Sequence, residues 1–292
     1  MKIETKKIDS IKREIYIEAD SELVKKKFED VFNRINKEAK IPGFRPGHIP
    51  ANILEKHYGN EANQKVLEEL IPEVYRKAIE KENLEVVDYP DIYDIKLDRN
   101  NLSFKAKVEV LPEINLKNYR RIKLHYQKTA VSEKEVSDYI NTLLKQKNVE
   151  KLDESFARSL GYFSVEEMRS SIEKQLFIQK ENQSHQKMES YILEHLLKET
   201  DFKVPESLVK RKLDYLLRQL KLDLALKGLS KEEIEAKEAL LEKELKPQAE
   251  KQARLEVIFT QIAKQENIPQ DENMFQKVLE FLFREADWQE AR

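Results

Sequence analysis

The distribution of apolar residues changes at Pro112, and this change constrains the fold more than any other feature of the chain. Before Pro112, segments in which apolar and polar residues alternate are interleaved with segments of helical spacing. Alternation with period two indicates half-buried strands, whereas spacing of three to four residues indicates amphipathic helices. After Pro112 a short connector leads into almost unbroken helical patterns. The sequence therefore predicts an α+β N-terminal domain followed by an all-α, elongated C-terminal domain with helical arms.

These patterns divide the chain into three parts. Residues 1–112 are expected to form the α+β domain, residues 113–150 an extended linker and a helix, and residues 151–292 the helical domain. Alternation at Ile122, Leu124 and Tyr126 indicates that the linker is extended. Within the first part, strands are expected at 11–18, 91–97 and 102–110, and helices from about residue 21, at 51–58 and at 61–81.

Several helix starts in the second half are marked by capping signals. Three Ser-x-x-Glu sequences, typical of capping boxes, begin at Ser132, Ser164 and Ser230. The pattern that Ser164 opens continues to about Glu199, which is long for a globular helix and indicates a projecting arm or a helical hairpin. Pro247 is expected to kink or break the helix in which it lies.

The composition restricts the class of protein. Hydrophobic residues make up 40% and charged residues 37%, with only 5 Gly and 9 Pro, which indicates a folded, helix-rich protein. The formal net charge of -2 means that any contact with RNA must come from a local basic patch. The absence of Cys excludes disulfides and thiolate chemistry. No apolar leader and no long apolar run is present, so a cytoplasmic protein without a membrane contact is expected.

The sequence shows no pattern that indicates catalysis. The five His residues are not spaced as metal ligands, and no glycine-rich phosphate loop is present. We therefore predict no catalytic residues, no metal site and no cofactor, and we do not expect the protein to use ATP.

One loop stands out between two helical patterns, at residues 42–50. Gly43 and Gly47 permit tight turns with positive φ, and the neighbouring prolines stiffen the loop. A stiff tip would present Phe44 and Arg45, of which Arg can pair with a phosphate and Phe can enter an apolar pocket or stack on a base. The alternative is an ordinary interhelical turn in which Phe44 folds back onto its own domain.

The loop and its surroundings resemble bacterial trigger factor. Its ribosome-binding signature, Gly-Phe-Arg-x-Gly-x-x-Pro, is matched by Gly43, Phe44, Arg45, Gly47 and Pro50. The resemblance covers residues 1–112 well and the remainder more loosely. It implies docking beside the exit site of the large ribosomal subunit, on a ribosomal protein and the adjacent rRNA. The implied ribosome-binding residues are Gly43, Phe44, Arg45, Pro46, Gly47 and Pro50.

The chain departs from the family pattern at two loop positions and in one domain. Many members carry Lys at the position of Pro46 and another basic residue at that of His48, so weaker or less salt-sensitive docking is expected. The family also inserts a prolyl-isomerase domain of the FKBP type. Here no Gly occurs between Asn60 and Leu160, and residues 152–161 are similar to the stretch that follows the isomerase domain. We therefore predict that this domain is missing and that the protein is not an enzyme.

The resemblance implies an ATP-independent chaperone that holds nascent or unfolded polypeptides, and it allows for a homodimer. The candidate client-binding residues are Leu220, Leu224, Ile258 and Phe259, although each of these could instead pack helix against helix. Two other functions remain open. One is a holdase that works without the ribosome, and the other is a helical scaffold or assembly factor.

Overall fold

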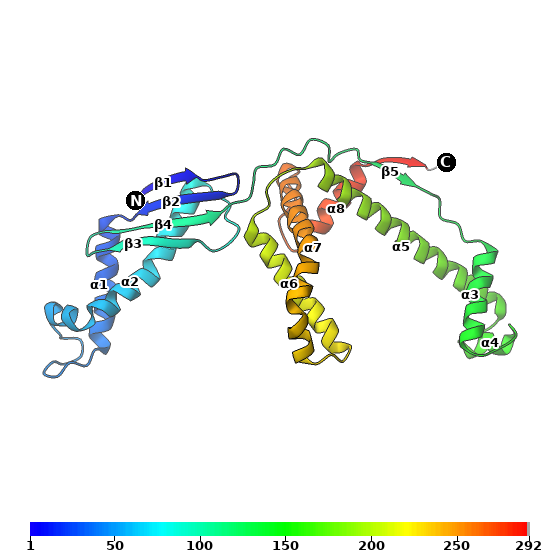
Figure 1. Ribbon diagram of the computed structural model, residues 1–292, viewed down its shortest axis with the longest axis horizontal. Helices are drawn as coiled ribbons and strands as arrows, with labels where there is room; N and C mark the ends of the chain where they lie inside the picture. The colour runs from blue at the N-terminus through cyan, green and yellow to red at the C-terminus, as the bar shows by residue number, and fades with distance from the viewer. Residues whose placement is uncertain (291–292) are drawn as a thin grey trace. The chain divides into compact units, whose positions relative to one another are not determined.

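The structure is a computed structural model that describes residues 1–290 (Figure 1). It divides into two compact units. The first unit combines Met1–Ile114 with Phe202–Val257, and the second combines Asn115–Asp201 with the residues from Ile258 onward. Strands and helices mix in the N-terminal region and helices dominate the rest, which confirms the predicted fold class.

A four-stranded antiparallel sheet forms the centre of the N-terminal region. Its strand order is β1-β2-β4-β3, so the first and third strands in sequence lie at the two edges. Apolar pairs such as Ile15 with Ala106 and Ile17 with Phe104 face each other across β2 and β4 and are fully buried. The strands are β1 (Lys2–Lys7), β2 (Lys12–Glu18), β3 (Asp91–Leu97) and β4 (Leu102–Glu109).

Helices α1 (Ser21–Glu38) and α2 (Ala51–Glu82) lie on the same side of this sheet (Figure 1). The buried side chains of α1 recur at three- and four-residue intervals, namely Val24, Phe28, Val31 and Ile35. Burying one such side chain stabilises the fold by about 1.5–3 kcal/mol. An ion pair of 2.6 Å between Arg34 and Glu69 also joins the exposed sides of the two helices.

One expectation for this region was wrong, and one strand was not predicted. The segments 51–58 and 61–81 form one continuous helix, α2. The partly buried Tyr58 connects Leu54 to the buried residues that recur every four positions from Ala62. Gly59 and Pro72 lie within this helix and do not end it. The sequence also did not predict β1, in which Ile3 is the only apolar side chain. Its charged character is typical of an edge strand, which pairs through the backbone and has little apolar surface to bury.

Helices α6 (Glu206–Leu226) and α7 (Lys231–Gln265) follow each other as a hairpin. In the first unit Leu213, Leu216 and Leu217 of α6 pack with Ala249 of α7. The capping box at Ser230 and Glu233 forms as predicted, since each residue accepts a main-chain N–H of the other. Of the kink or break expected at Pro247, the break does not occur. The residues on both sides of Pro247 belong to α7, and Ala249 is packed against α6.

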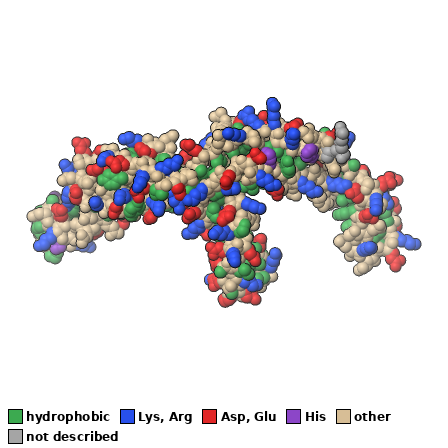
Figure 2. All heavy atoms as spheres, turned by 45° about the horizontal axis from the view of Figure 1, so that its top comes forward, with side chains coloured by type: hydrophobic (Ala, Val, Ile, Leu, Met, Phe, Trp, Pro, Cys, Tyr) green, Lys and Arg blue, Asp and Glu red, His purple; other side chains and the backbone are tan. Residues whose placement is uncertain are grey.

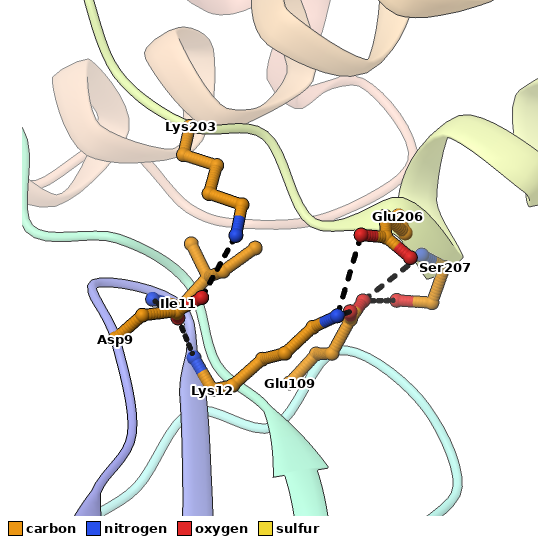
Figure 3. A network of polar contacts seen from close by, with 7 residues as sticks. All are labelled: Asp9, Ile11, Lys12, Glu109, Lys203, Glu206 and Ser207. Carbon is orange, nitrogen blue, oxygen red and sulfur yellow. Dashed lines mark hydrogen bonds and ion pairs between the residues drawn. The ribbon is translucent and has the colours of Figure 1, made fainter.

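Helix α6 begins against the sheet, and a carboxylate from β4 caps its first turn (Figure 3). Glu109 accepts hydrogen bonds from the Ser207 amide at 2.9 Å and the Ser207 hydroxyl at 2.6 Å. The residue at the N-cap, Pro205, has no side-chain hydrogen bond to offer. Lys12 of β2 pairs with Glu206 at 3.3 Å and with Glu109 at 3.6 Å. The start of α6 is therefore held by side chains that come from the N-terminal sheet.

A third ion pair in the same network joins Asp9 to Lys203 at 2.8 Å. Asp9 also accepts hydrogen bonds from the amides of Ile11 and Lys12, at 2.9 and 2.7 Å. These donors, Lys203 first among them, hold the pKa of the Asp9 carboxyl well below its ordinary value. The carboxylate is therefore better stabilised in the folded protein than in the unfolded chain.

The second unit contains α3 (Glu133–Gln146), α4 (Glu154–Ser159), α5 (Val165–Glu199), α8 (Met274–Glu285) and the end of α7. Val136 and Ile140 of α3 pack with Phe156 of α4 and with Met168 of α5. The predicted helix from Ser164 to about Glu199 is confirmed as α5. Its cap differs from the expectation, since the Glu167 carboxylate accepts the Phe163 amide at 2.6 Å instead of the Ser164 amide.

The extended linker pairs with a strand that the sequence did not predict. Strand β5 (Lys123–Tyr126) runs parallel to β6 (Asp287–Glu290), and Leu124 lies opposite Trp288. The Trp288 indole donates a hydrogen bond of 3.0 Å to the carbonyl of Phe283. The two strands are only four residues long, and a single short run of this kind carries little periodicity.

The Asp9 contact predicts a specific pH dependence of stability. Because the pKa of Asp9 is depressed in the folded state, its contribution is fully present above about pH 4, the pKa of an unfolded Asp, and is lost as the pH falls through the folded pKa. We expect Asp9→Asn to lower the free energy of unfolding at pH 7 and the gap from wild type to narrow below pH 4. Urea unfolding at pH 7 and pH 3 measures this gap.

Asp30→Asn is the matched control, since it removes an exposed carboxylate from α1. A gap between wild type and Asp9→Asn that is equally large at both pH values would contradict the assignment.

Candidate functional site: the loop between helices α1 and α2

The loop that joins α1 to α2 is exposed at its tip and buried at its base. All residues from Gly43 to His48 are exposed, whereas Ala39 and Ile49, at the two ends, are 4% and 3% exposed. Phe44 keeps 37% of its surface exposed, so its ring is not buried in its own domain. The structure thus brings all six predicted ribosome-binding residues together in one protruding segment.

Two consecutive Pro-Gly turns shape the tip. The Phe44 amide donates to the Ile41 carbonyl at 3.1 Å, and the His48 amide donates to the Arg45 carbonyl at 3.0 Å. In each turn Pro occupies the second position and Gly the third, and Gly43 and Gly47 have φ values of 88° and 87°. This is the pattern of a type II turn, in which Pro fixes φ and the third residue needs positive φ.

Asn36 of α1 fastens the second turn to the helix. Its carbonyl accepts the Gly47 amide at 2.8 Å. Its side-chain amide pairs with both main-chain groups of Ile49, accepting from the nitrogen at 3.1 Å and donating to the oxygen at 3.2 Å. The contact between Asn36 and the loop was not predicted from the sequence. An Asn close to a helix end beside a Gly-Pro loop was the only available signal, and it does not specify a partner.

The tip offers one positive charge that is free to bind. The Arg45 guanidinium forms no ion pair or hydrogen bond with any other residue in the range 1–290. Residues 36–50 contain three cations and one carboxylate, besides His48. Next to the half-exposed Phe44, this cation gives the tip both an apolar contact and a charged one. Such a pair suits a partner that presents an apolar pocket beside phosphate or carboxylate oxygens.

The candidate client-binding residues fall into two groups. Leu220 and Leu224 of α6 are partly exposed. Ile258 and Phe259 of α7 are 0% and 2% exposed, and Phe259 stacks on Phe275 at 4.8 Å. For this second pair the structure shows the alternative that the sequence left open, namely packing inside the protein. A client would have to displace core contacts to reach these two side chains.

Other apolar side chains near the turn between α6 and α7 are more accessible. Leu222 and Leu226 of α6 are 61% and 86% exposed, and Leu240 of α7 is 58% exposed. Lys, Arg, Asp and Glu side chains are interspersed over the face of the molecule drawn in Figure 2, with apolar groups between them. Exposed apolar groups separated by charges form a surface that can bind unfolded chains weakly.

Neither a metal site nor a membrane-spanning helix occurs in the part of the chain that the structure describes. No three His, Asp or Glu side chains of residues 1–290 gather closely enough to hold a metal ion. None of the helices described there is both long and apolar enough to cross a membrane.

Two models of one protein family match this chain. The family model for bacterial trigger factor protein (TF) matches residues 1–143, and the model for its C-terminus matches residues 164–291. The chain belongs to the trigger factor family. Both matched regions agree with the fold, in which the sheet and the loop between α1 and α2 precede the helical hairpins.

Individual trigger factors are similar over different lengths. The trigger factor of Solibacter usitatus is 45% identical over 114 residues, which are 39% of this chain and 27% of that relative. The trigger factor of Halothermothrix orenii is 22% identical over 384 positions, covering 96% of this chain and 90% of the relative. A solved structure of a trigger factor chaperone has the same fold, with a TM-score of 0.57, 13% identity and coverage of 97% and 90%.

The backbone conformation predicts opposite effects on stability for Gly→Ala substitutions in the loop and in α2. At Gly47 an Ala must adopt a φ of 87°, so we expect Gly47→Ala to lower the free energy of unfolding by about 1 kcal/mol. Gly59 lies inside α2, where an added Cβ meets only Glu55 at 3.9 Å. Gly59→Ala should therefore raise the free energy of unfolding by about 0.5–1 kcal/mol.

Urea unfolding of both variants measures these changes under identical conditions. Loss of stability at Gly59, or none at Gly47, would show that the backbone is not held as described.

Proposed function

We propose that this protein is an ATP-independent chaperone of the cytoplasm. It docks at the exit site of the large ribosomal subunit, on a ribosomal protein and the adjacent rRNA, and it holds nascent or unfolded polypeptides. The observation that carries the proposal is the loop at residues 42–50, which presents Phe44 and Arg45 on two hydrogen-bonded turns. Membership of the trigger factor family supports the same conclusion.

Docking through such a tip costs little conformational entropy. A loop whose backbone is already fixed loses little conformational freedom when it binds, so more of the contact free energy appears as affinity. Arg45 supplies the cation for phosphate oxygens, and Phe44 supplies an apolar anchor. Pro46 sets φ at the second position of the turn that carries Arg45. The residue that replaces a family lysine thus removes one positive charge and stiffens the loop at the same place.

Holding of clients is expected to use the exposed side chains of the α6–α7 hairpin. Leu220 and Leu224 join the more exposed Leu222 and Leu226 on α6, and no nucleotide is needed for such contacts. We propose weak, multiple contacts with apolar stretches of the client. Off the ribosome, the resemblance to the family also allows two copies of the chain to pair.

The lack of prolyl-isomerase activity is a further part of the proposal. Aligned with the trigger factor of Halothermothrix orenii over 384 positions, this chain of 292 residues leaves at least 92 of those positions without a counterpart. The two family models leave only residues 144–163 unmatched between them. That number of unmatched positions is about the size of a small domain, which supports the loss of an inserted one.

Docking is tested by cosedimentation with purified ribosomes. We expect Phe44→Ala combined with Arg45→Ala to weaken binding by about tenfold or more. An aromatic side chain that becomes buried in an interface and an Arg are typical binding hot spots. The matched control is Phe177→Ala with Arg169→Ala, which removes the same two residue types from exposed positions on α5.

Equal binding of the two double variants would contradict docking through the loop and would favour a holdase that works without the ribosome. The reduced positive charge at Pro46 and His48 is the observation that favours this second candidate. Suppression of aggregation of a chemically unfolded client then separates both chaperone functions from a scaffold. A scaffold would leave the aggregation rate unchanged.

The proposed lack of prolyl-isomerase activity can be measured directly. We expect the cis–trans isomerisation of a proline-containing test peptide to proceed at its uncatalysed rate in the presence of this protein. The uncatalysed process takes tens to hundreds of seconds at 25 °C and is easily followed. A rate that rises in proportion to the protein concentration would show that the chain retains an isomerase site.

A further inference from the structure

Asn36 lies in the last turn of α1, where a helix has main-chain carbonyls without helical partners. The Ile35 carbonyl accepts a hydrogen bond from the Ala39 amide, which is the i to i+4 pattern of a helix. Asn36 instead accepts the Gly47 amide at 2.8 Å, from the far side of the loop. The end of the helix thus binds the residue at the third position of the second turn.

The side chain of Asn36 makes a second attachment, two residues further along the loop. Its Oδ1 accepts the Ile49 amide at 3.1 Å, and its Nδ2 donates to the Ile49 carbonyl at 3.2 Å. One side-chain amide therefore pairs with both main-chain groups of one residue, as a neighbouring strand would. Ile49 is only 3% exposed. Main-chain groups next to a buried side chain are poorly placed to turn to water instead, so loss of these bonds is costly.

These three hydrogen bonds fix the segment that follows Arg45. The turn from Arg45 to His48 is closed by its own hydrogen bond of 3.0 Å, and Asn36 holds that turn at Gly47 and just beyond it. The first turn, from Ile41 to Phe44, has only its own hydrogen bond of 3.1 Å among the main-chain contacts of the loop tip. The hydrogen bonds of Asn36 thus tie the turn that carries Arg45 to α1.

We propose that Asn36 is a positioning residue for ribosome docking, a role that rests on the docking function proposed above. Asn36 acts through the loop backbone, with no need to touch the ribosome. It keeps Arg45 and Phe44 in one arrangement before binding, so that the ordering of the loop does not have to be supplied by the partner. Asn36 lies outside the signature that Gly43, Phe44, Arg45, Gly47 and Pro50 match.

The test compares Asn36→Ala with wild type in quantitative ribosome binding. Alanine keeps the main-chain carbonyl that binds Gly47 and is favourable in a helix, but it removes both bonds to Ile49. We expect the dissociation constant to rise about three- to tenfold, which is the scale of ordering one or two mobile groups. Hydrogen exchange should become faster at the amides of Gly47, His48 and Ile49, and not at those of the sheet.

Val74→Ala is the control for a purely structural role. Val74 is a fully buried residue of α2 outside the loop, and its truncation destabilises the same domain. All variants are measured at a temperature where thermal unfolding shows that they are folded. Should Asn36→Ala fold poorly, Asn36→Ser replaces it, because it keeps a polar side chain that is too short to pair with both groups of Ile49.

Each outcome either supports or overturns the positioning role of Asn36. Weaker docking and faster loop exchange for Asn36→Ala, with docking unchanged for Val74→Ala, would support the positioning role. Docking of Asn36→Ala within twofold of wild type, or an equal loss for Val74→Ala, would overturn it. If Phe44→Ala with Arg45→Ala fails to bind in the same assay, the docking function stands even though the inference about Asn36 falls. If that double variant binds like wild type, both are overturned.

Discussion

The burial of one face of the four-stranded sheet under α1 and α2 is the constraint on which the functional loop depends. Fully buried side chains of the strands, among them Ile15, Ile17 and Phe104, belong to the same core as Val24 and Val66 of the helices. Each helix is therefore fixed in rotation about its own axis, because only one of its faces is apolar. This fixes both ends of the connecting loop, and the Pro-Gly turns need only determine the path between them.

Much of this arrangement can be read from local sequence, but some of it depends on partners that are distant in the chain. Alternation predicted β2 and β4, and the Gly-Phe-Arg-Pro-Gly run predicted an exposed turn. The role of Asn36 was not predictable, because its partners at Gly47 and Ile49 are defined by the folded path of the loop. Strand β1 was missed for a similar reason, since an edge strand owes its conformation to backbone pairing with its neighbour.

The two prolines inside helices show where a local rule fails. A proline in a helix interior removes one main-chain hydrogen bond and can cost about 3 kcal/mol. In α2, Pro72 lies between the fully buried Leu70 and Val74, and in α7, Pro247 lies two residues before the fully buried Ala249. Packing of neighbouring side chains is worth a comparable amount. Tertiary burial therefore outweighs the local penalty, and sequence alone does not show that burial.

The cap that Glu109 provides to Ser207 has a consequence for the order in which the protein itself folds. The two residues are 98 positions apart, and the carboxylate belongs to the last strand of the N-terminal sheet. During synthesis from the N-terminus, every strand of that sheet has been made before the first residue of α6 exists, and domains generally fold as units in that order. All strands that position Glu109 are therefore already synthesised when α6 begins to form, so this cap can form without waiting for any later part of the chain.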